Sequence, residues 1–121
     1  MSERPAMRME RSPDALVERF GRVLEAFPEA TRRKMFGYPA AFVGGNLATS
    51  LYGPGWMVRL AEPERSELLA SGGTVFEPMP GRPMKAYVLL PASVLADDRA
   101  TATWVGRAIV HAATLPPKTS G

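Results

Sequence analysis

The sequence predicts a single α+β domain in which one antiparallel sheet carries its helices on one face. The chain has 121 residues, 45% of them hydrophobic, which suits one domain with its own core. Short apolar runs bounded by glycine and proline alternate with longer segments of helical periodicity. Read in order, these segments give α-β-β-β-α-β-β-α, a pattern that favours two packed layers.

The first helix is expected after a charged, polar arm over residues 1–11, which we interpret as flexible. Ser12 is predicted to cap this helix, and Pro13 to occupy its first position. Pro28 ends it, because proline cannot continue a helix. Between these limits the apolar residues recur at helical spacing and form one stripe, made of Leu16, Val17, Phe20, Val23, Leu24 and Phe27.

Three strands are predicted next, joined by tight turns. Ala40–Val43 and Leu47–Tyr52 flank Gly44-Gly45-Asn46, a combination typical of a β-hairpin. Trp56–Leu60 then alternates apolar and other side chains, as expected of a strand buried on one face. The three segments together predict an antiparallel meander.

The second half of the chain repeats the alternation of helix and strand. A helix begins near Pro63 and stops at Gly72-Gly73. The last helix begins at Asp97 or Asp98 and ends before Pro116-Pro117, so the domain spans 12–115 and is followed by a polar tail over 116–121. Between these helices we expect strands over Thr74–Met79 and Lys85–Leu90 and a turn of helix over Pro91–Ala96.

Composition narrows the classes of function. The chain has no cysteine, which excludes disulfides, thiolate catalysis and Cys-bound metal clusters. No apolar run approaches the roughly 20 residues that span a bilayer, and the first residues lack the apolar core of a secretory signal. We therefore expect a cytoplasmic protein with no membrane partner. The net charge of +3 says little about partners, because each predicted terminal segment carries one of the excess charges.

The residues that a catalytic or metal site needs are few. His111 is the one histidine, and its helical position beside the apolar stripe favours a packing or surface role over that of a triad base or zinc ligand. Asp97 and Asp98 are interpreted as helix-capping residues, with magnesium binding through carboxylates as the open alternative. The paired glycines lack the spacing of a phosphate-binding loop. We expect no catalytic residues, no metal and no cofactor.

Basic residues form the strongest remaining signal for a site. No acidic residue occurs between Ala30 and Ala61, although several cations do. If the loops of the domain converge, these cations form a patch for phosphate or a nucleic-acid backbone, with the rings of Tyr38, Tyr52 and Trp56 for stacking. The alternative is that these residues form an ordinary solvated surface. The candidate patch consists of Arg32, Arg33, Lys34, Tyr38, Arg59, Arg82 and Lys85.

Methionines are also frequent near the predicted strands. Met35, Met57, Met79 and Met84 are interpreted as core filler, because the flexible thioether fits irregular gaps in a hydrophobic core. A methionine-lined binding site is the alternative interpretation.

Two blocks of residues resemble the TfoX/Sxy N-terminal domain family. The first is Arg33-Lys34-Met35-Phe36-Gly37-Tyr38-Pro39-Ala40-Ala41-Phe42-Val43, followed by Gly45-Asn46. The second is Phe76-Glu77-Pro78-Met79-Pro80-Gly81-Arg82-Pro83-Met84. The segments most typical of the family are Lys34, Met35, Phe36 and Gly37 in the first block and Gly81, Arg82, Pro83 and Met84 in the second. Where the family pattern usually has a second glycine, this chain has Tyr38-Pro39.

The resemblance carries its own expectations. It implies an α+β fold like that of secretion chaperones, and we expect a short stand-alone member. Named members regulate bacterial competence genes together with the cyclic-AMP receptor protein. They carry a second, C-terminal domain, for which we expect no counterpart in this chain. The resemblance supplies no catalytic residue that maps onto this chain.

Three functions remain in competition. The favoured one is a non-catalytic interaction or regulatory module that binds a protein partner, with a nucleic-acid backbone as the less supported ligand. The second is a small-ligand binder or enzyme that uses Tyr38, Arg82 and Lys85. The third is a homodimer formed through an exposed sheet face or edge. The most useful observation is the relative position of Met35–Pro39 and Pro80–Met84. If the two segments are adjacent, they share either a site or a packing role, and the exposure of their side chains separates these two alternatives.

Overall fold

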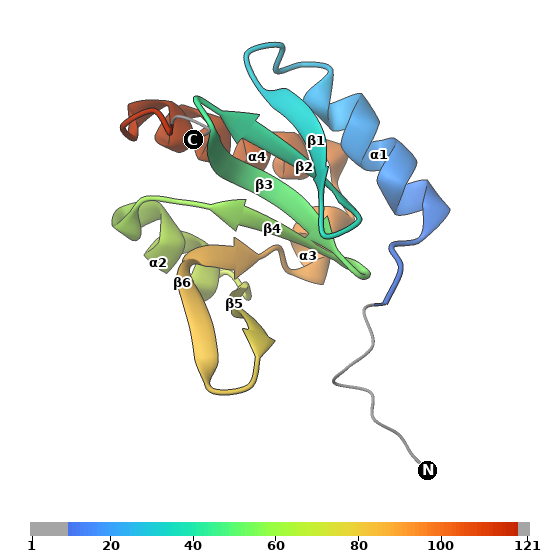
Figure 1. Cartoon of the computed structure of the whole chain (residues 1–121). Helices are drawn as coiled ribbons and strands as arrows, with labels where there is room; N and C mark the ends of the chain where they lie inside the picture. The colour runs from blue at the N-terminus through green and yellow to red at the C-terminus, as the bar shows by residue number, and fades with distance from the viewer. Residues whose placement is uncertain (1–9, 119–121) are drawn as a thin grey trace.

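A computed structural model describes residues 10–118 of the chain and contains four helices and one six-stranded sheet (Figure 1). The predicted α+β class is confirmed. The helices are α1 (Asp14–Leu24), α2 (Glu62–Ala70), α3 (Ala92–Leu95) and α4 (Asp98–Thr114). The strands are β1 (Thr31–Met35), β2 (Tyr38–Val43), β3 (Asn46–Tyr52), β4 (Gly55–Arg59), β5 (Thr74–Met79) and β6 (Arg82–Leu89).

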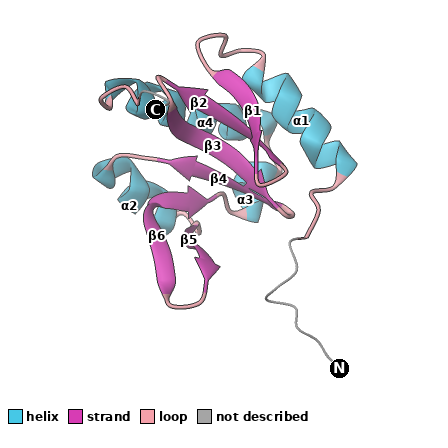
Figure 2. Ribbon diagram, in the orientation of Figure 1, coloured by secondary structure: helices cyan, strands magenta, loops and turns pink. Residues whose placement is uncertain are grey.

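The sheet is antiparallel throughout, with the spatial order β1-β2-β3-β4-β6-β5 (Figure 2). The first four strands form a meander joined by tight turns. The β5–β6 hairpin is inserted with β6 against β4, so β5 lies at the edge opposite β1. The pairing of β5 with β6 is interrupted between Phe76 and Met79, which bends this hairpin away from a regular ladder.

All four helices pack on one face of the sheet. A single core contains Phe20 of α1, Leu68 of α2, Val94 of α3 and Ile109 of α4, together with strand residues such as Trp56. The rings of Phe20 and Trp56 lie 5.2 Å apart between centroids. Figure 1 looks onto the other face, with α4 behind the strands. The sheet therefore has one helix-covered face and one face that no helix of the described chain covers.

The structure adds a strand that the sequence did not predict. β1 has the sequence Thr-Arg-Arg-Lys-Met and is mostly exposed, so it lacks the apolar alternation by which strands are recognised. It forms through its backbone pairing with β2, from Thr31 opposite Phe42 to Met35 opposite Tyr38. The last strand also begins at Arg82, earlier than the predicted Lys85.

The predicted N-terminal cap is wrong for α1 and confirmed for α4. Ser12 does not cap α1, because its hydroxyl donates to the carbonyl of Gly53 at 2.6 Å, and Pro13 occupies the cap position. At α4 the prediction is confirmed, since the Asp97 carboxylate accepts from the backbone N–H groups of Arg99 and Ala100. Among the helices of the described residues, none is long and apolar enough to cross a membrane.

Candidate functional site

A groove of about 300 Å³ runs over the uncovered face of the sheet, and we call it the open-face groove. Alternation within each strand assigns the side chains: on β4, Trp56 and Val58 enter the core, whereas Met57 and Arg59 line the groove. The groove is lined by Met35, Phe36, Tyr38, Phe42, Gly45, Leu47, Ser50, Leu51, Tyr52, Met57, Arg59, Phe76, Pro78, Met84, Tyr87 and Lys118.

One wall of the groove is the turn between β1 and β2. Its two central residues both have positive φ, 54° at Phe36 and 84° at Gly37, as in the tight primed turns that join hairpin strands. Glycine adopts this conformation freely, but a phenylalanine does so at a cost of about 1 kcal/mol or more. The side chain of Phe36 is nevertheless 79% exposed. A strained and exposed aromatic residue at the edge of an apolar groove is typical of a binding site.

The opposite wall is the β5–β6 hairpin. Phe76, Pro78 and Met84 line the groove from this hairpin, and the side chain of Met84 is 41% exposed. Met79, on the same hairpin, is also exposed. The interpretation of these two methionines as core filler is therefore wrong, because the bent hairpin holds them outside the core. Met57, by contrast, is buried in the floor of the groove.

A row of aromatic rings closes one end of the groove, which we call the aromatic end. The ring of Tyr52 lies 5.3 Å from that of Tyr38 and 4.9 Å from that of Phe76. The Tyr38 hydroxyl donates to the carbonyl of Glu10, which holds the chain before α1 against this end. These contacts connect β2, β3 and β5, so the row is fixed by tertiary packing.

The other end carries positive charge, and we call it the cationic end. Lys118 reaches it because its backbone N–H donates to the carbonyl of Gly44 at 2.7 Å, and the Asn46 side-chain amide donates to the carbonyl of Pro116 at 3.0 Å. A Cβ on Gly45 would lie only 2.5 Å from the Lys118 carbonyl oxygen. The turn of Gly44 to Asn46 thus needs glycine to hold residues 116–118 in place.

Two arginines stack on aromatic rings of the same face. The guanidinium of Arg59 lies 5.5 Å from the centre of the Tyr87 ring, and that of Arg33 lies 4.2 Å from the Phe42 ring. Burial raises the pKa of the Tyr87 hydroxyl above its ordinary value, although the charge of Arg59 acts in the opposite direction. Arg59 also lies within 3.5 Å of the Leu47 carbonyl, which places it at the cationic end.

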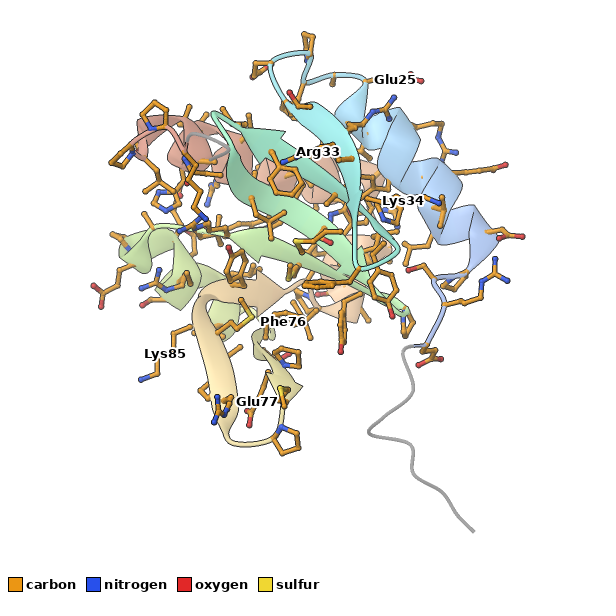
Figure 3. All side chains as sticks on the ribbon, viewed as in Figure 1. Glu25, Arg33, Lys34, Phe76, Glu77 and Lys85 are labelled. Atoms are coloured by element: carbon orange, nitrogen blue, oxygen red, sulfur yellow. The ribbon has the colours of Figure 1, made fainter. Side chains whose placement is uncertain are left out.

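The structure separates the residues of the predicted basic patch. Arg33, Tyr38 and Arg59 belong to the uncovered face, as described above. Arg32 points the other way and donates to the carbonyl of Gly21 in α1, and Lys34 lines a hollow shared with α1. Figure 3 shows Lys34 on the α1 side of β1 and Lys85 on the distant β5–β6 hairpin. Arg82 and Lys85 are exposed on that hairpin.

The residues that the sequence analysis considered for acid–base catalysis or metal binding lie outside the groove. His111 is half-buried on α4, and burial, with a smaller contribution from the charge of Arg59, lowers its pKa. Asp97 caps α4, and Asp98 forms an ion pair with Arg19 at 2.7 Å. Within residues 10–118, no three His, Cys, Asp or Glu side chains lie close enough to hold a metal ion together.

The two family-like blocks meet in the open-face groove. Met35, Phe36 and Tyr38 come from the first block, and Phe76, Pro78 and Met84 come from the second. Gly45, which follows the first block, positions the tail at the cationic end. Of the rings considered for stacking, Tyr38 and Tyr52 line the groove, whereas Trp56 is fully buried in the core. Sequence reasoning missed Tyr87 and Lys118 as lining residues. Strand alternation was the available signal for Tyr87, but no sequence pattern placed Lys118 beside it.

Comparison with known proteins agrees with this picture. The family model described as the TfoX N-terminal domain matches residues 22–112, which include both blocks and most of the groove. Among curated proteins, none matches the chain. The match extends over far more than half of the 121 residues, and the chain therefore belongs to the TfoX N-terminal domain family.

Proposed function

We propose that this domain is a non-catalytic binding module that recognises a partner protein through the open-face groove. One observation carries the proposal: the segments that resemble the family, although far apart in the sequence, line one groove and present exposed apolar side chains there. Segments that merely packed the fold would bury these side chains, whereas Phe36 and Met84 are held in solvent.

The chemistry of the groove supports recognition of a protein. Aromatic residues, methionine and arginine are enriched at protein interfaces. The described lining contains all three, and among those residues there is no histidine, cysteine, aspartate or glutamate to act as a nucleophile or a general base. We extend the proposal to a regulatory role in the bacterial cytoplasm, by analogy with the transcriptional and competence role of named family members.

A small ligand and a nucleic-acid backbone are less well supported. The groove volume of about 300 Å³ lies at the lower end of the range for ligand pockets. A nucleic-acid backbone needs a continuous row of cations. Arg32 and Lys34 instead lie toward α1, away from Arg33 and Arg59.

Photo-crosslinking in living cells tests the proposal. A photoreactive phenylalanine analogue replaces Phe36 in one variant and Val110 in a matched control, since Val110 is 66% exposed but lies on α4. We expect one defined protein adduct at position 36, identified by mass spectrometry, and its absence at position 110. Equal adducts at both positions, or none at position 36, would contradict a partner site in the groove.

A further inference from the structure

We propose that the open-face groove binds an amphipathic helix of the partner protein, with its C-terminal end and its carboxylates at the cationic end. This inference rests on the proposed function and adds the chemistry and direction of the bound segment. It follows from the length of the groove, its charge distribution and the hydrogen-bonding groups along it.

The groove has two chemically different ends, separated along β3. Leu47 marks the cationic end, beside Arg59 and Lys118, and Tyr52 marks the aromatic end, beside Tyr38 and Phe76. Tyr52 lies five residue steps along β3 from Leu47, which corresponds to about 17 Å at roughly 3.4 Å per residue. An occupant that uses both ends must therefore bridge this distance.

The floor of the groove favours an occupant whose backbone is already hydrogen-bonded. The Ser50 hydroxyl lies 2.8 Å from the carbonyl oxygen of Leu51 and 3.2 Å from that of Pro39, so its one proton is used within the domain. Met57 and the aromatic row offer few hydrogen-bonding groups to an extended peptide. An extended peptide would leave backbone N–H and C=O groups unpaired there, whereas a helix pairs them internally.

Helix geometry matches the length of the groove. About 11 residues of helix span 17 Å at roughly 1.5 Å per residue. Apolar side chains at positions i, i+4 and i+7 then lie on one face, and a carboxylate at i+11 lies on the same face near the far end. Such a helix also covers the exposed side chains of Phe36 and Met84 on the two walls of the groove. A thin acyl chain in the groove would leave both side chains in water.

Electrostatics favours one direction of the helix. The C-terminal end of a helix carries partial negative charge, and so do the carboxylates proposed there. Arg59 and Lys118 lie at the cationic end, and the described lining contains no acidic residue. At the aromatic end, by contrast, the Glu10 side chain lies close to Gly53. The preferred helix therefore runs antiparallel to β3, from the aromatic end to the cationic end.

Synthetic peptides test this chemistry without knowledge of the partner. Three capped peptides of about 18 residues share an alanine and glutamine host and leucines at i, i+4 and i+7. One has two glutamates in its last turn, the second has them in its first turn, and the third has lysines in its last turn. Fluorescence anisotropy with the full 121-residue chain measures affinity, and NMR of the protein locates the binding surface.

We expect the peptide with glutamates in its last turn to bind about five- to tenfold more tightly than the peptide with glutamates in its first turn, and the lysine peptide to bind most weakly. Higher helicity cannot explain this order, because C-terminal carboxylates weaken an isolated helix. Arg59→Gln or Lys118→Gln should abolish the preference. Arg107→Gln, which removes a cation from α4 above the Trp104 ring, should leave it unchanged.

Several results would overturn the helix proposal. Equal affinity of the two glutamate peptides, resonance shifts confined to α4, or no shift in the groove at millimolar peptide would each do so. Dodecanoate that binds in the groove more tightly than every peptide would instead indicate an acyl ligand. If crosslinking at position 36 still captures a defined protein, the proposed function stands and only the helix chemistry fails.

Discussion

The two faces of the sheet use the same strands for different purposes. On β4, Trp56 and Val58 are fully buried against the helices, while Met57 and Arg59, their immediate neighbours, line the open-face groove. The helix-covered face contains apolar side chains in close packing. The uncovered face combines aromatic rings, methionines and guanidinium groups. Because alternate residues point to opposite faces, we expect substitutions one residue apart to alter stability and the proposed recognition separately.

The largest effect is expected on the helix-covered face. Trp56→Ala removes a fully buried ring that contacts Phe20 and whose indole N–H donates to the Thr49 hydroxyl at 2.9 Å. We expect the free energy of unfolding to fall by about 3–5 kcal/mol. Chemical denaturation followed by circular dichroism measures this loss. A loss below 1 kcal/mol would show that this face is not the main source of stability.

Glycine substitutions separate backbone strain from the role of the tail. Gly45 and Gly37 have similar positive φ values, 82° and 84°, but only Gly45 faces the backbone of Lys118. Gly37→Ala should cost about 1 kcal/mol of stability through strain alone. Gly45→Ala should cost about 1–3 kcal/mol more, or displace the tail and shift the Lys118 resonances. Equal costs with an unmoved tail would contradict the proposed anchoring.

On the uncovered face, a substitution should raise stability while it weakens recognition. Phe36→Asn creates an Asn-Gly turn, the sequence that this turn geometry favours, and relieves the strain at φ 54°. We expect a gain of about 0.5–1 kcal/mol in the free energy of unfolding. Peptide binding should weaken at the same time, and so should crosslinking through a photoreactive residue placed at Met84. A variant that binds as well as the original chain would show that Phe36 has no part in recognition.

The smallest effect concerns pH. Since the pKa of His111 is lowered in the folded chain, the unfolded chain binds more protons just below the ordinary value of 6.5. Stability should therefore decline slightly as the pH falls from 7 through that value. His111→Gln should remove this slope when denaturation midpoints are compared at several pH values. A slope that persists in the variant would assign the decline to other groups.

The contrast between the faces also explains what the sequence could predict. The first helix and the Trp56 strand were predictable because their apolar residues repeat with the period of the element. The hairpin before that strand and the helix near Pro63 were predictable from the glycine and proline residues that bound them. The Asp97 cap was predictable from local chemistry. β1 was not predictable, because its charged residues lack apolar alternation and the strand forms only through its pairing with β2. The groove was not predictable either, since it depends on the distance between segments some 40 residues apart, Phe36 and Phe76.

The candidate site shows the same limit. The sequence indicated a patch of cations between Arg32 and Lys85, but strand alternation places the side chains of Arg32 and Arg33 on opposite faces of the sheet. It also drew attention to the family-like blocks, which the structure brings together. Lys118 could not be assigned because its place depends on hydrogen bonds between the tail and a distant turn.

Methyl NMR offers the most direct test that the uncovered face is the recognition surface. The methyl groups of Met35, Met57 and Met84 report on the groove, and those of Val105 and Ile109 report on the core beneath α4. We predict that the partner captured at position 36 shifts the groove methyls and leaves the core methyls unchanged. Shifts confined to Val105, Ile109 and the exposed Val110 would place recognition on the helical face and contradict the account.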